Sequence, residues 1–200
     1  MVKFIFRFWI LFFLCISLAW IFFYGVANWN LLGKLPSTQQ LENPKFHQAS
    51  EIYSTDGKII GTYYTENRIN VEYNQIPENL INALIATEDK RYEKHSGIDF
   101  RGLARAVAGI FVGGKGGAST ITQQLSKMLF TERRSGNKLK AVKQKLKEWV
   151  MAVRLERLYT KEEILTMYFN QYDFLYSAVG VYNASNVYFD KPLNKLTIEE

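Results

Sequence analysis

Two stretches of the sequence decide its fold: Glu88–Asp99, which reads EDKRYEKHSGID, and Gly117–Lys127, which reads GASTITQQLSK. Before the first stretch, apolar residues recur at helical spacing, at Ile81, Leu84 and Ile85. Glu88 continues their face, so the pattern predicts a carboxylate that points toward the core. Burial would raise the pKa of a glutamate from about 4.3 toward neutrality, which suits proton transfer. The spacing leaves one alternative open, a helix that ends at Glu88 and returns it to solvent.

The second stretch predicts a helix with one apolar and one polar side. The apolar side carries Ile121, Leu125, Met128 and Leu129. The polar side carries Thr120, Gln123, Gln124 and Lys127. Hydroxyls and amides that end in one lysine suit hydrogen bonds to sugar hydroxyls and a phosphate, although a solvated face is the simpler interpretation.

The N-terminus of the 200-residue chain predicts a membrane anchor ahead of a single domain. Residues 8–27 carry no charge, and at about 1.5 Å per residue such a run spans roughly 30 Å of hydrocarbon. Lys3 and Arg7 precede the run, so we expect residues 1–7 in the cytoplasm and everything after residue 27 outside. A signal peptide cleaved near Ala27 and a buried core helix are the alternatives.

Composition narrows the function classes. The only cysteine, Cys15, lies in the apolar run, so the exported part has no disulfide to rely on. A formal net charge of +6 indicates an anionic partner, and a membrane-tethered, exported chain disfavours nucleic acid. His95 has only His47 as a second histidine and no cysteine nearby, so we expect a structural role and no zinc site.

The exported part divides into a stalk, residues 28–48, and a domain, residues 49–200. A β-hairpin is predicted from residues 51–53 and 58–64, on either side of an Asp-Gly turn. After Pro77 the pattern is helical, and it includes a helix over residues 100–112 with Asp99 as its N-cap. The glycine-rich residues 113–117 then form either a mobile binding loop or a plain linker.

A basic stretch precedes the second candidate carboxylate. Its cations are Arg133, Arg134, Lys138, Lys140, Lys143, Lys145 and Lys147. Such runs are usually solvated faces, but an exported protein at a bilayer also meets lipid-linked phosphates. The carboxylate is Glu148, for which a local ion pair with Lys145 is a sufficient alternative explanation. Glu156, two turns further on, is a rival on nearly the same face.

These segments resemble the peptidoglycan glycosyltransferase module of family 51, found in class A penicillin-binding proteins and monofunctional transglycosylases. Residues 88–97 resemble its Glu-Asp-x-x-aromatic-x-x-His-x-Gly motif, and residues 118–127 resemble its Gly/Ala-Ser-Thr-Ile-Thr-Gln-Gln motif with the lysine that follows. Residues 145–149 and 159–170 resemble the third and fourth motifs. The resemblance extends from Ser50 to the end of the chain.

The resemblance implies a mainly α, lysozyme-like helical domain with a small N-terminal hairpin. Such domains polymerise lipid II, the undecaprenyl-pyrophosphate-linked disaccharide pentapeptide, onto a growing glycan chain at the outer face of the cytoplasmic membrane. Glu88 would be the general base, Lys127 with Arg133 or Arg134 would meet the pyrophosphate, and Glu148 would position it or a divalent cation such as Mg or Mn. The remaining substrate-binding positions implied are Asp89, Ser119, Thr120, Gln123, Gln124 and Lys145.

Three positions depart from the family pattern. Gln144-Lys145 stands where Arg-Lys is usual, Phe174-Leu175 where an aromatic-Gly pair is usual, and Asp190 where glycine is usual. The family normally continues beyond the position of Glu200, often into a penicillin-binding transpeptidase domain. We therefore expect a domain that is incomplete at its C-terminus and that has cell-wall synthesis proteins as partners.

Two other function classes stay open. A membrane-anchored, lysozyme-like hydrolase or lytic transglycosylase would also use a glutamate, but it needs no cationic cluster for a pyrophosphate. A non-catalytic wall-binding module would keep its affinity after loss of Glu88.

Overall fold

The computed structural model describes residues 2–28, 35–37, 40–41, 50–56, 59–63, 69–111, 117–130, 137–176 and 178–200. The chain forms two compact units, Met1–Pro36 and Ser37–Glu200. The first contains α1, Val2–Asn28, which exposes large apolar side chains such as Phe6, Leu11 and Phe13. Within the described ranges, no helix meets the length and apolarity needed to cross a membrane. The anchor over residues 8–27 stays a prediction.

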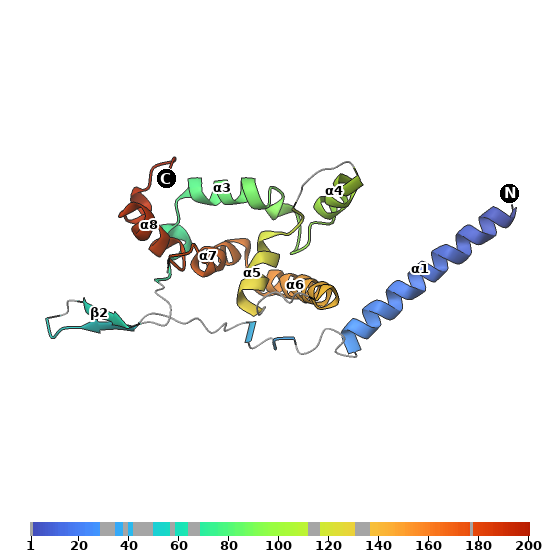
Figure 1. The fold of residues 1–200 in the computed structure, drawn as a ribbon, viewed down its shortest axis with the longest axis horizontal. Coiled ribbons are helices and arrows are strands. Elements are labelled where there is room, and N and C mark those ends of the chain that lie inside the picture. Colours follow the sequence, from blue (N-terminus) through green and yellow to red (C-terminus); the bar gives the residue numbers. More distant parts are fainter. Residues whose placement is uncertain are drawn as a thin grey trace. The chain divides into compact units, whose positions relative to one another are not determined.

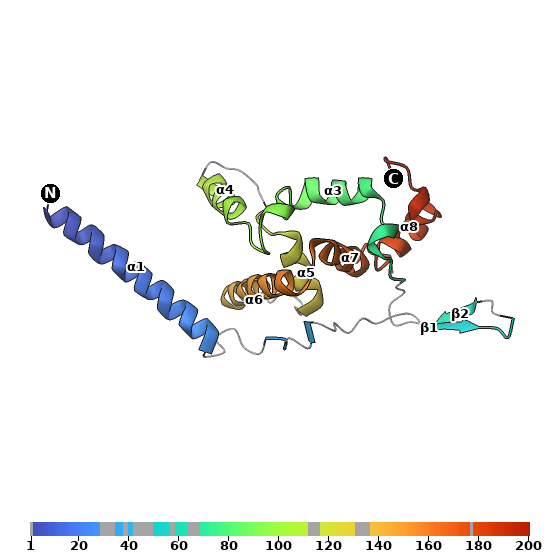
Figure 2. The ribbon, with the colours of Figure 1, turned by 180° about the vertical axis from the view of Figure 1, so that it is seen from behind.

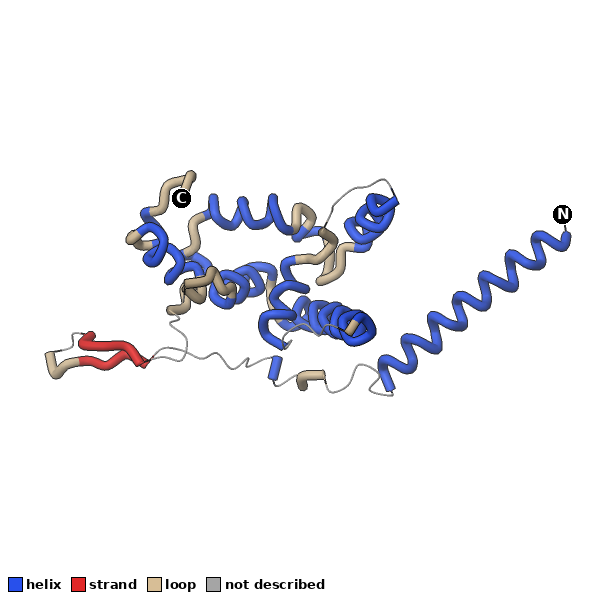
Figure 3. The backbone as a smooth tube through the Cα atoms, in the orientation of Figure 1, coloured by secondary structure: helices blue, strands red, loops and turns tan. Residues whose placement is uncertain are grey.

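The second unit is mainly helical, as predicted (Figure 1; Figure 3). It includes one hairpin, in which β1, Ser50–Tyr53, pairs antiparallel with β2, Ile59–Tyr63. The helices that follow are η1 Tyr73–Gln75, α3 Glu78–Glu88, η2 Tyr92–Lys94, α4 Phe100–Phe111, α5 Ile121–Phe130, α6 Lys138–Leu158, α7 Lys161–Gln171, α8 Val181–Phe189 and η3 Leu193–Lys195. Residues 112–116, most of the predicted glycine-rich loop, lie outside the described residues.

Helix α5 is the central element of this unit and packs against both α6 and α7, while α3 and α4 lie along one side of the three (Figure 2). Its Ile121 and Leu125 are fully buried, as the apolar stripe predicted. Buried side chains of the two neighbouring helices complete the core, among them Met151, Leu155, Ile164, Leu165 and Phe169. The site elements are therefore arranged around a helix that has little surface of its own.

Side-chain caps explain where the helices begin. Asp99 precedes α4 and accepts the backbone N–H of Arg101 at 3.1 Å, which confirms the predicted N-cap. Thr120 caps α5 by accepting the N–H of Gln123 at 3.2 Å. A capping box begins α7, because Thr160 and Glu163 each accept the backbone N–H of the other.

Within the described part of the predicted stalk, Leu41 is buried inside the Ser37–Glu200 unit. Leu41 is 1% exposed, and its carbonyl accepts the hydroxyl of Tyr159 at 2.6 Å. The rest of the segment is described only in part, over residues 35–37 and 40–41.

Leu175 and Asp190 have left-handed backbone conformations, with φ of 70° and 50°. These are two of the positions at which the resembled family usually carries glycine. Glycine adopts this region freely, whereas another residue pays roughly 1–2 kcal/mol. Asp190 forms the C-cap of α8, where a short polar side chain is tolerated. At both positions the residue differs from the family's usual glycine, but the backbone keeps a conformation that favours glycine.

Gly97 allows the loop after α3 to touch the backbone of α6. Its φ is +88°, and a Cβ placed there would lie 2.8 Å from the carbonyl carbon of Ala152. The carbonyl of Gly97 in turn accepts hydrogen bonds from Thr120 Oγ1 at 2.8 Å and Gln123 Nε2 at 3.2 Å. One residue therefore joins the loop to both α5 and α6.

We expect Gly97→Ala to lower the free energy of unfolding by about 2 kcal/mol or more, because the methyl group meets rigid backbone and the positive φ strains alanine. Urea denaturation measures the change. Gly117→Ala is the matched control, since no atom lies within 4 Å of the added Cβ. Equal midpoints for the two variants would contradict the close-approach argument.

Candidate active site

Glu88 is the last residue of α3, and it is exposed. The prediction that it points toward the core is wrong, because the helix ends there and the backbone turns away at Asp89. Of the apolar residues on the same face, Ile81 is buried but Leu84 and Ile85 are only half-buried. The Oε2 atom of Glu88 accepts a hydrogen bond from Gln124 Nε2 at 2.7 Å, which ties α3 to α5.

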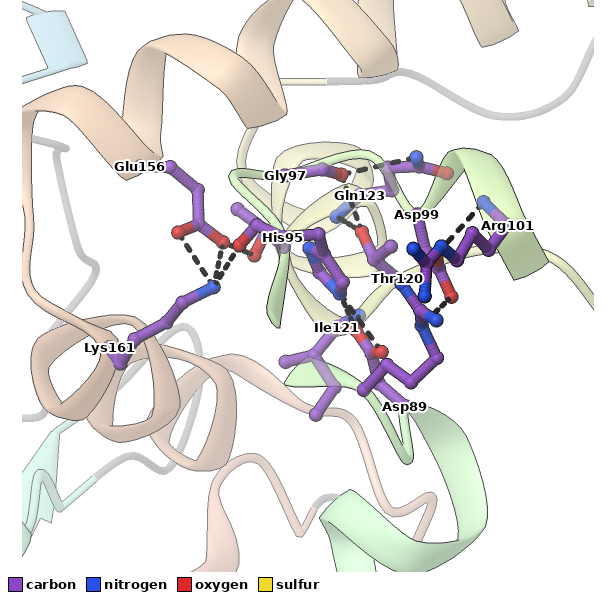
Figure 4. Close-up of polar contacts among 12 residues, drawn as sticks. Asp89, His95, Gly97, Asp99, Arg101, Thr120, Ile121, Gln123, Glu156 and Lys161 are labelled. Atoms are coloured by element: carbon purple, nitrogen blue, oxygen red, sulfur yellow. Dashed lines mark hydrogen bonds and ion pairs between the residues drawn. The ribbon is translucent and has the colours of Figure 1, made fainter. Parts of the chain in front are cut away.

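Asp89, beside the candidate base, is buried and bonded within the protein (Figure 4). Its carboxylate lies 3.0 and 3.1 Å from Nε2 of His95 and accepts the backbone N–H of Ile121 at 3.1 Å. A carboxylate acceptor requires the proton on Nε2 of His95. The His95 side chain is 4% exposed and lies against Asp89, which fits the predicted structural role, but its buried Nδ1 has no hydrogen-bond partner among the described residues. Asp89 acts first as an anchor for the start of α5, and its predicted contact with substrate stays a prediction.

Two residues predicted on the polar side of α5 lie in the interior. Thr120 and Gln123 are each 2% exposed, and both donate to the carbonyl of Gly97. The prediction assumed that hydroxyl and amide side chains opposite the apolar stripe of α5 face solvent, and for these two residues this is wrong. Here the loop after α3 covers that side of the helix, so these groups hold the loop in place.

Ser119, Lys145 and Glu148 come together, while their predicted contacts with substrate stay predictions. Lys145 Nζ donates to Ser119 Oγ at 2.9 Å and pairs with Glu148 Oε2 at 3.1 Å. The local ion pair that the sequence left open is therefore present, between a buried Glu148 and a half-exposed Lys145. The ammonium group thus links α6 to the residues that precede α5.

The structure does not build a metal site around Glu148. Over the described part of the chain, no group of three or more histidine, cysteine, aspartate or glutamate side chains is placed to hold a metal ion. The contact that the structure gives the Glu148 carboxylate is the Lys145 ammonium. A divalent cation there stays a prediction.

Glu156, the rival carboxylate, belongs to a separate network at the start of α7 (Figure 4). It accepts the hydroxyl of Thr122 at 2.6 Å and pairs with Lys161 Nζ at 2.8 Å. Lys161 also donates to the carbonyl of His95 and lies 4.2 Å from the ring centre of Tyr92. Burial raises the pKa of Tyr92, whose hydroxyl donates to the Lys161 carbonyl. These contacts make Glu156 a structural residue.

A cavity of about 380 Å³ lies beside Glu88. The start of α5 and the loop after α3 line it, and its cationic side chains are Lys90, Arg91, Lys94 and Arg105. Arg91 lies 3.1 Å from Asp99. Burial tends to raise the pKa of Asp99, but the N–H of Gly102 and the Arg91 charge outweigh it, and the pKa is lowered. Glu88 therefore borders a hollow that is lined by these four cations and by the carboxylates of Asp89 and Asp99.

The other predicted cations are placed only in part. Lys127 lies near the end of α5 and is exposed. Arg133 and Arg134 lie outside the described residues.

Sequence reasoning missed Tyr168 of α7. Its hydroxyl donates to Gln124 Oε1 at 3.1 Å, and Gln124 in turn donates to Glu88. Spacing marks Tyr168 only as a core residue, because it falls on the buried side of α7 with Ile164 and Leu165. No local signal shows that its hydroxyl reaches the candidate base.

Comparisons with known proteins show which family the chain is similar to. A family model described as Transglycosylase matches residues 56–200. Penicillin-binding protein 1A of Escherichia coli (strain K12) is 38% identical over 200 residues, which are 99% of this chain and 23% of that protein. Penicillin-binding protein 1F of Bacillus subtilis (strain 168) is 42% identical over 156 residues, 77% of this chain and 21% of that protein. The chain thus spans under a quarter of the length of these curated relatives.

We expect Asp89→Asn to lower the free energy of unfolding by about 1–2 kcal/mol, because an amide gives a weaker bond to the Ile121 N–H and to His95. Thermal and urea unfolding measure the loss. Glu93→Gln, the same change of charge at an exposed residue of η2, should leave stability within about 0.5 kcal/mol of wild type. Wild-type stability in Asp89→Asn would show that the carboxylate does not anchor α5.

Proposed function

Since the chain belongs to the transglycosylase family, we propose that it is a peptidoglycan glycosyltransferase that polymerises lipid II into glycan strands. Glu88 is the general base of this reaction. It takes the proton of the acceptor sugar's 4-hydroxyl, whose oxygen attacks the anomeric carbon of the lipid-linked growing chain with inversion. The bond from that carbon to the phosphate oxygen breaks, and undecaprenyl pyrophosphate leaves with the electron pair.

One observation carries this proposal: an exposed carboxylate at the edge of a cationic cavity, with one oxygen held and the other available. Gln124 holds Oε2 of Glu88, and no described residue bonds to Oε1. A substrate hydroxyl can therefore approach Oε1 without displacing a protein group. Four cationic side chains line the cavity against two carboxylates other than Glu88, Asp89 and Asp99, and this excess of positive charge favours a polyanionic substrate such as a lipid pyrophosphate.

The leaving pyrophosphate needs cations that stay in place as charge develops. We assign the neutralisation of the leaving pyrophosphate to Lys127, with Arg133 or Arg134. We assign the positioning of the pyrophosphate to Glu148. Lys145 is held between Ser119 and Glu148, so its ammonium group keeps a fixed position near the start of α5. A fixed cation stabilises a transition state without a cost of reorganisation.

The exposure of Glu88 argues against the hydrolase alternative. A lysozyme-like hydrolase needs a protonated acid, which such enzymes keep in an apolar pocket. Glu88 instead lies at the surface beside cations and accepts an amide N–H. A wall-binding module remains the second candidate, and it differs in one respect: its wild-type form would bind its ligand but would form no polymer from lipid II.

The exposed apolar surface of α1 supports a location at the cytoplasmic membrane. The charges of Lys3 and Arg7 precede residues 8–27, so the Ser37–Glu200 unit lies on the outer side, where lipid II is consumed. By analogy with the class A penicillin-binding proteins, a transpeptidase domain and other cell-wall synthesis proteins are its expected partners.

We expect Glu88→Gln to reduce glycan synthesis from labelled lipid II by about 10²–10⁴-fold, because glutamine cannot accept the proton. Binding of lipid II and the melting temperature should stay close to wild type. Glu78→Gln, at the exposed start of the same helix, is the control and should remain active. Retention of more than about a tenth of wild-type activity would remove Glu88 from the base role. Cleavage of preformed glycan by the wild type would favour a hydrolase.

We expect the protein to stay with membranes after alkaline carbonate washing. A variant with Leu11→Lys, Leu14→Lys and Leu18→Lys keeps the length of α1 but exposes charge, so it should be released. Protease added from outside should reach the Ser37–Glu200 unit. Release of the wild-type protein by carbonate would contradict attachment through α1.

A further inference from the structure

Tyr168, Gln124 and Glu88 form a line of two hydrogen bonds that crosses three helices. The hydroxyl of Tyr168 on α7 donates to Oε1 of Gln124 on α5 at 3.1 Å. Nε2 of the same amide donates to Oε2 of Glu88, at the end of α3, at 2.7 Å. The candidate base is thus connected to the core through a single amide.

Only one arrangement of donors and acceptors allows both hydrogen bonds to form. An ionised carboxylate can only accept, so Gln124 must present its NH₂ group to Glu88. Its carbonyl oxygen then points to Tyr168, whose hydroxyl must donate. A reversed amide would place two oxygens against each other at Glu88 and would lose its favourable contact there.

The surroundings of Tyr168 keep its hydroxyl a donor. The side chain is 4% exposed, and burial raises the pKa of Tyr168, with smaller contributions from Tyr172 and Glu88. The hydroxyl therefore keeps its proton, and stays a donor, at neutral pH. The ring is fixed by its neighbours, since Tyr172 packs on it at a centroid distance of 5.5 Å and Phe169 meets it edge-on at 6.2 Å.

We propose that Tyr168 is a positioning residue for the base: it fixes the amide of Gln124 so that this amide holds Oε2 of Glu88 and leaves Oε1 for the acceptor hydroxyl. This proposal rests on the function proposed above. Glu88 is exposed and has several rotatable bonds, so without the amide its carboxylate would sample many positions in solvent. Restricting it to one position lowers the cost of reaching the reactive geometry.

The proposal also gives Gln124 a second role. The motif resemblance places Gln124 in the substrate groove, and the structure shows that both ends of its amide already have protein partners. Gln124 therefore contributes to turnover through Glu88, and we expect its loss to lower kcat more than it raises KM.

The first test is Tyr168→Phe, which removes the hydroxyl and keeps the ring. We expect kcat for lipid II polymerisation to fall about three- to tenfold, the loss of one hydrogen bond, with KM within about twofold of wild type. Tyr172→Phe is the matched control, because it removes a hydroxyl one turn away that makes no hydrogen bond with the described residues. An unchanged kcat in Tyr168→Phe would overturn the proposal.

The second test is a double-mutant cycle with Gln124→Met, a side chain of similar shape without the amide. If Tyr168 acts through Gln124, adding Tyr168→Phe to Gln124→Met should lower kcat by less than about twofold further. Additive losses would mean that Tyr168 only supports packing, and the proposal would be wrong. The Gln124→Met variant alone should lower kcat at least as far as Tyr168→Phe does. The hydrogen-bonded connection to Glu88 can therefore still be tested if the Tyr168→Phe variant folds poorly.

Glu88→Gln separates failure of this proposal from failure of the proposed function. Loss of polymerisation in Glu88→Gln with full kcat in Tyr168→Phe would leave Glu88 as the base and remove only the role of Tyr168. Polymerisation that survives Glu88→Gln would overturn both assignments.

Discussion

The contact on which the rest of the site depends is that of the buried Asp89 carboxylate with the first N–H of α5. A helix start carries N–H groups without partners and a partial positive charge, so an ionised aspartate is a favourable partner there. The same carboxylate holds His95, and the loop between them returns along α5. One acidic side chain therefore joins the end of α3, the following loop and the central helix.

This joint explains why neighbouring residues of one motif have opposite environments. Asp89 turns inward to reach Ile121, and the same turn ends α3 and leaves Glu88 outside. Gly97 completes the loop by lying against the backbone of α6, and its carbonyl receives Thr120 and Gln123. The polar groups of the second motif thus support the loop, while Gln124 and Ser119, at its edges, contact Glu88 and Lys145.

The three glutamates considered for proton transfer differ in the groups that lie next to their carboxylates. Glu148 and Glu156 are each paired with a lysine and nearly covered, so each holds an ammonium group in place. Glu88 has an amide donor and open space, which suits a group that must accept a proton from a substrate. A buried ion pair is costly to break, so the two paired glutamates are poor candidates for proton transfer.

The sequence by itself determined the helical class, the N-cap at Asp99 and the family, because these follow from local spacing and short motifs. It could not place Glu88 or Gln123, since a helical period says which residues share a face and not which face another element covers. The contacts of the Gly97 carbonyl, of Lys161 with the His95 carbonyl, and of Gln124 with Tyr168 and Glu88 join residues 23 to 66 positions apart. Only the tertiary structure decides such contacts, because they depend on how α3, α5 and α7 pack together.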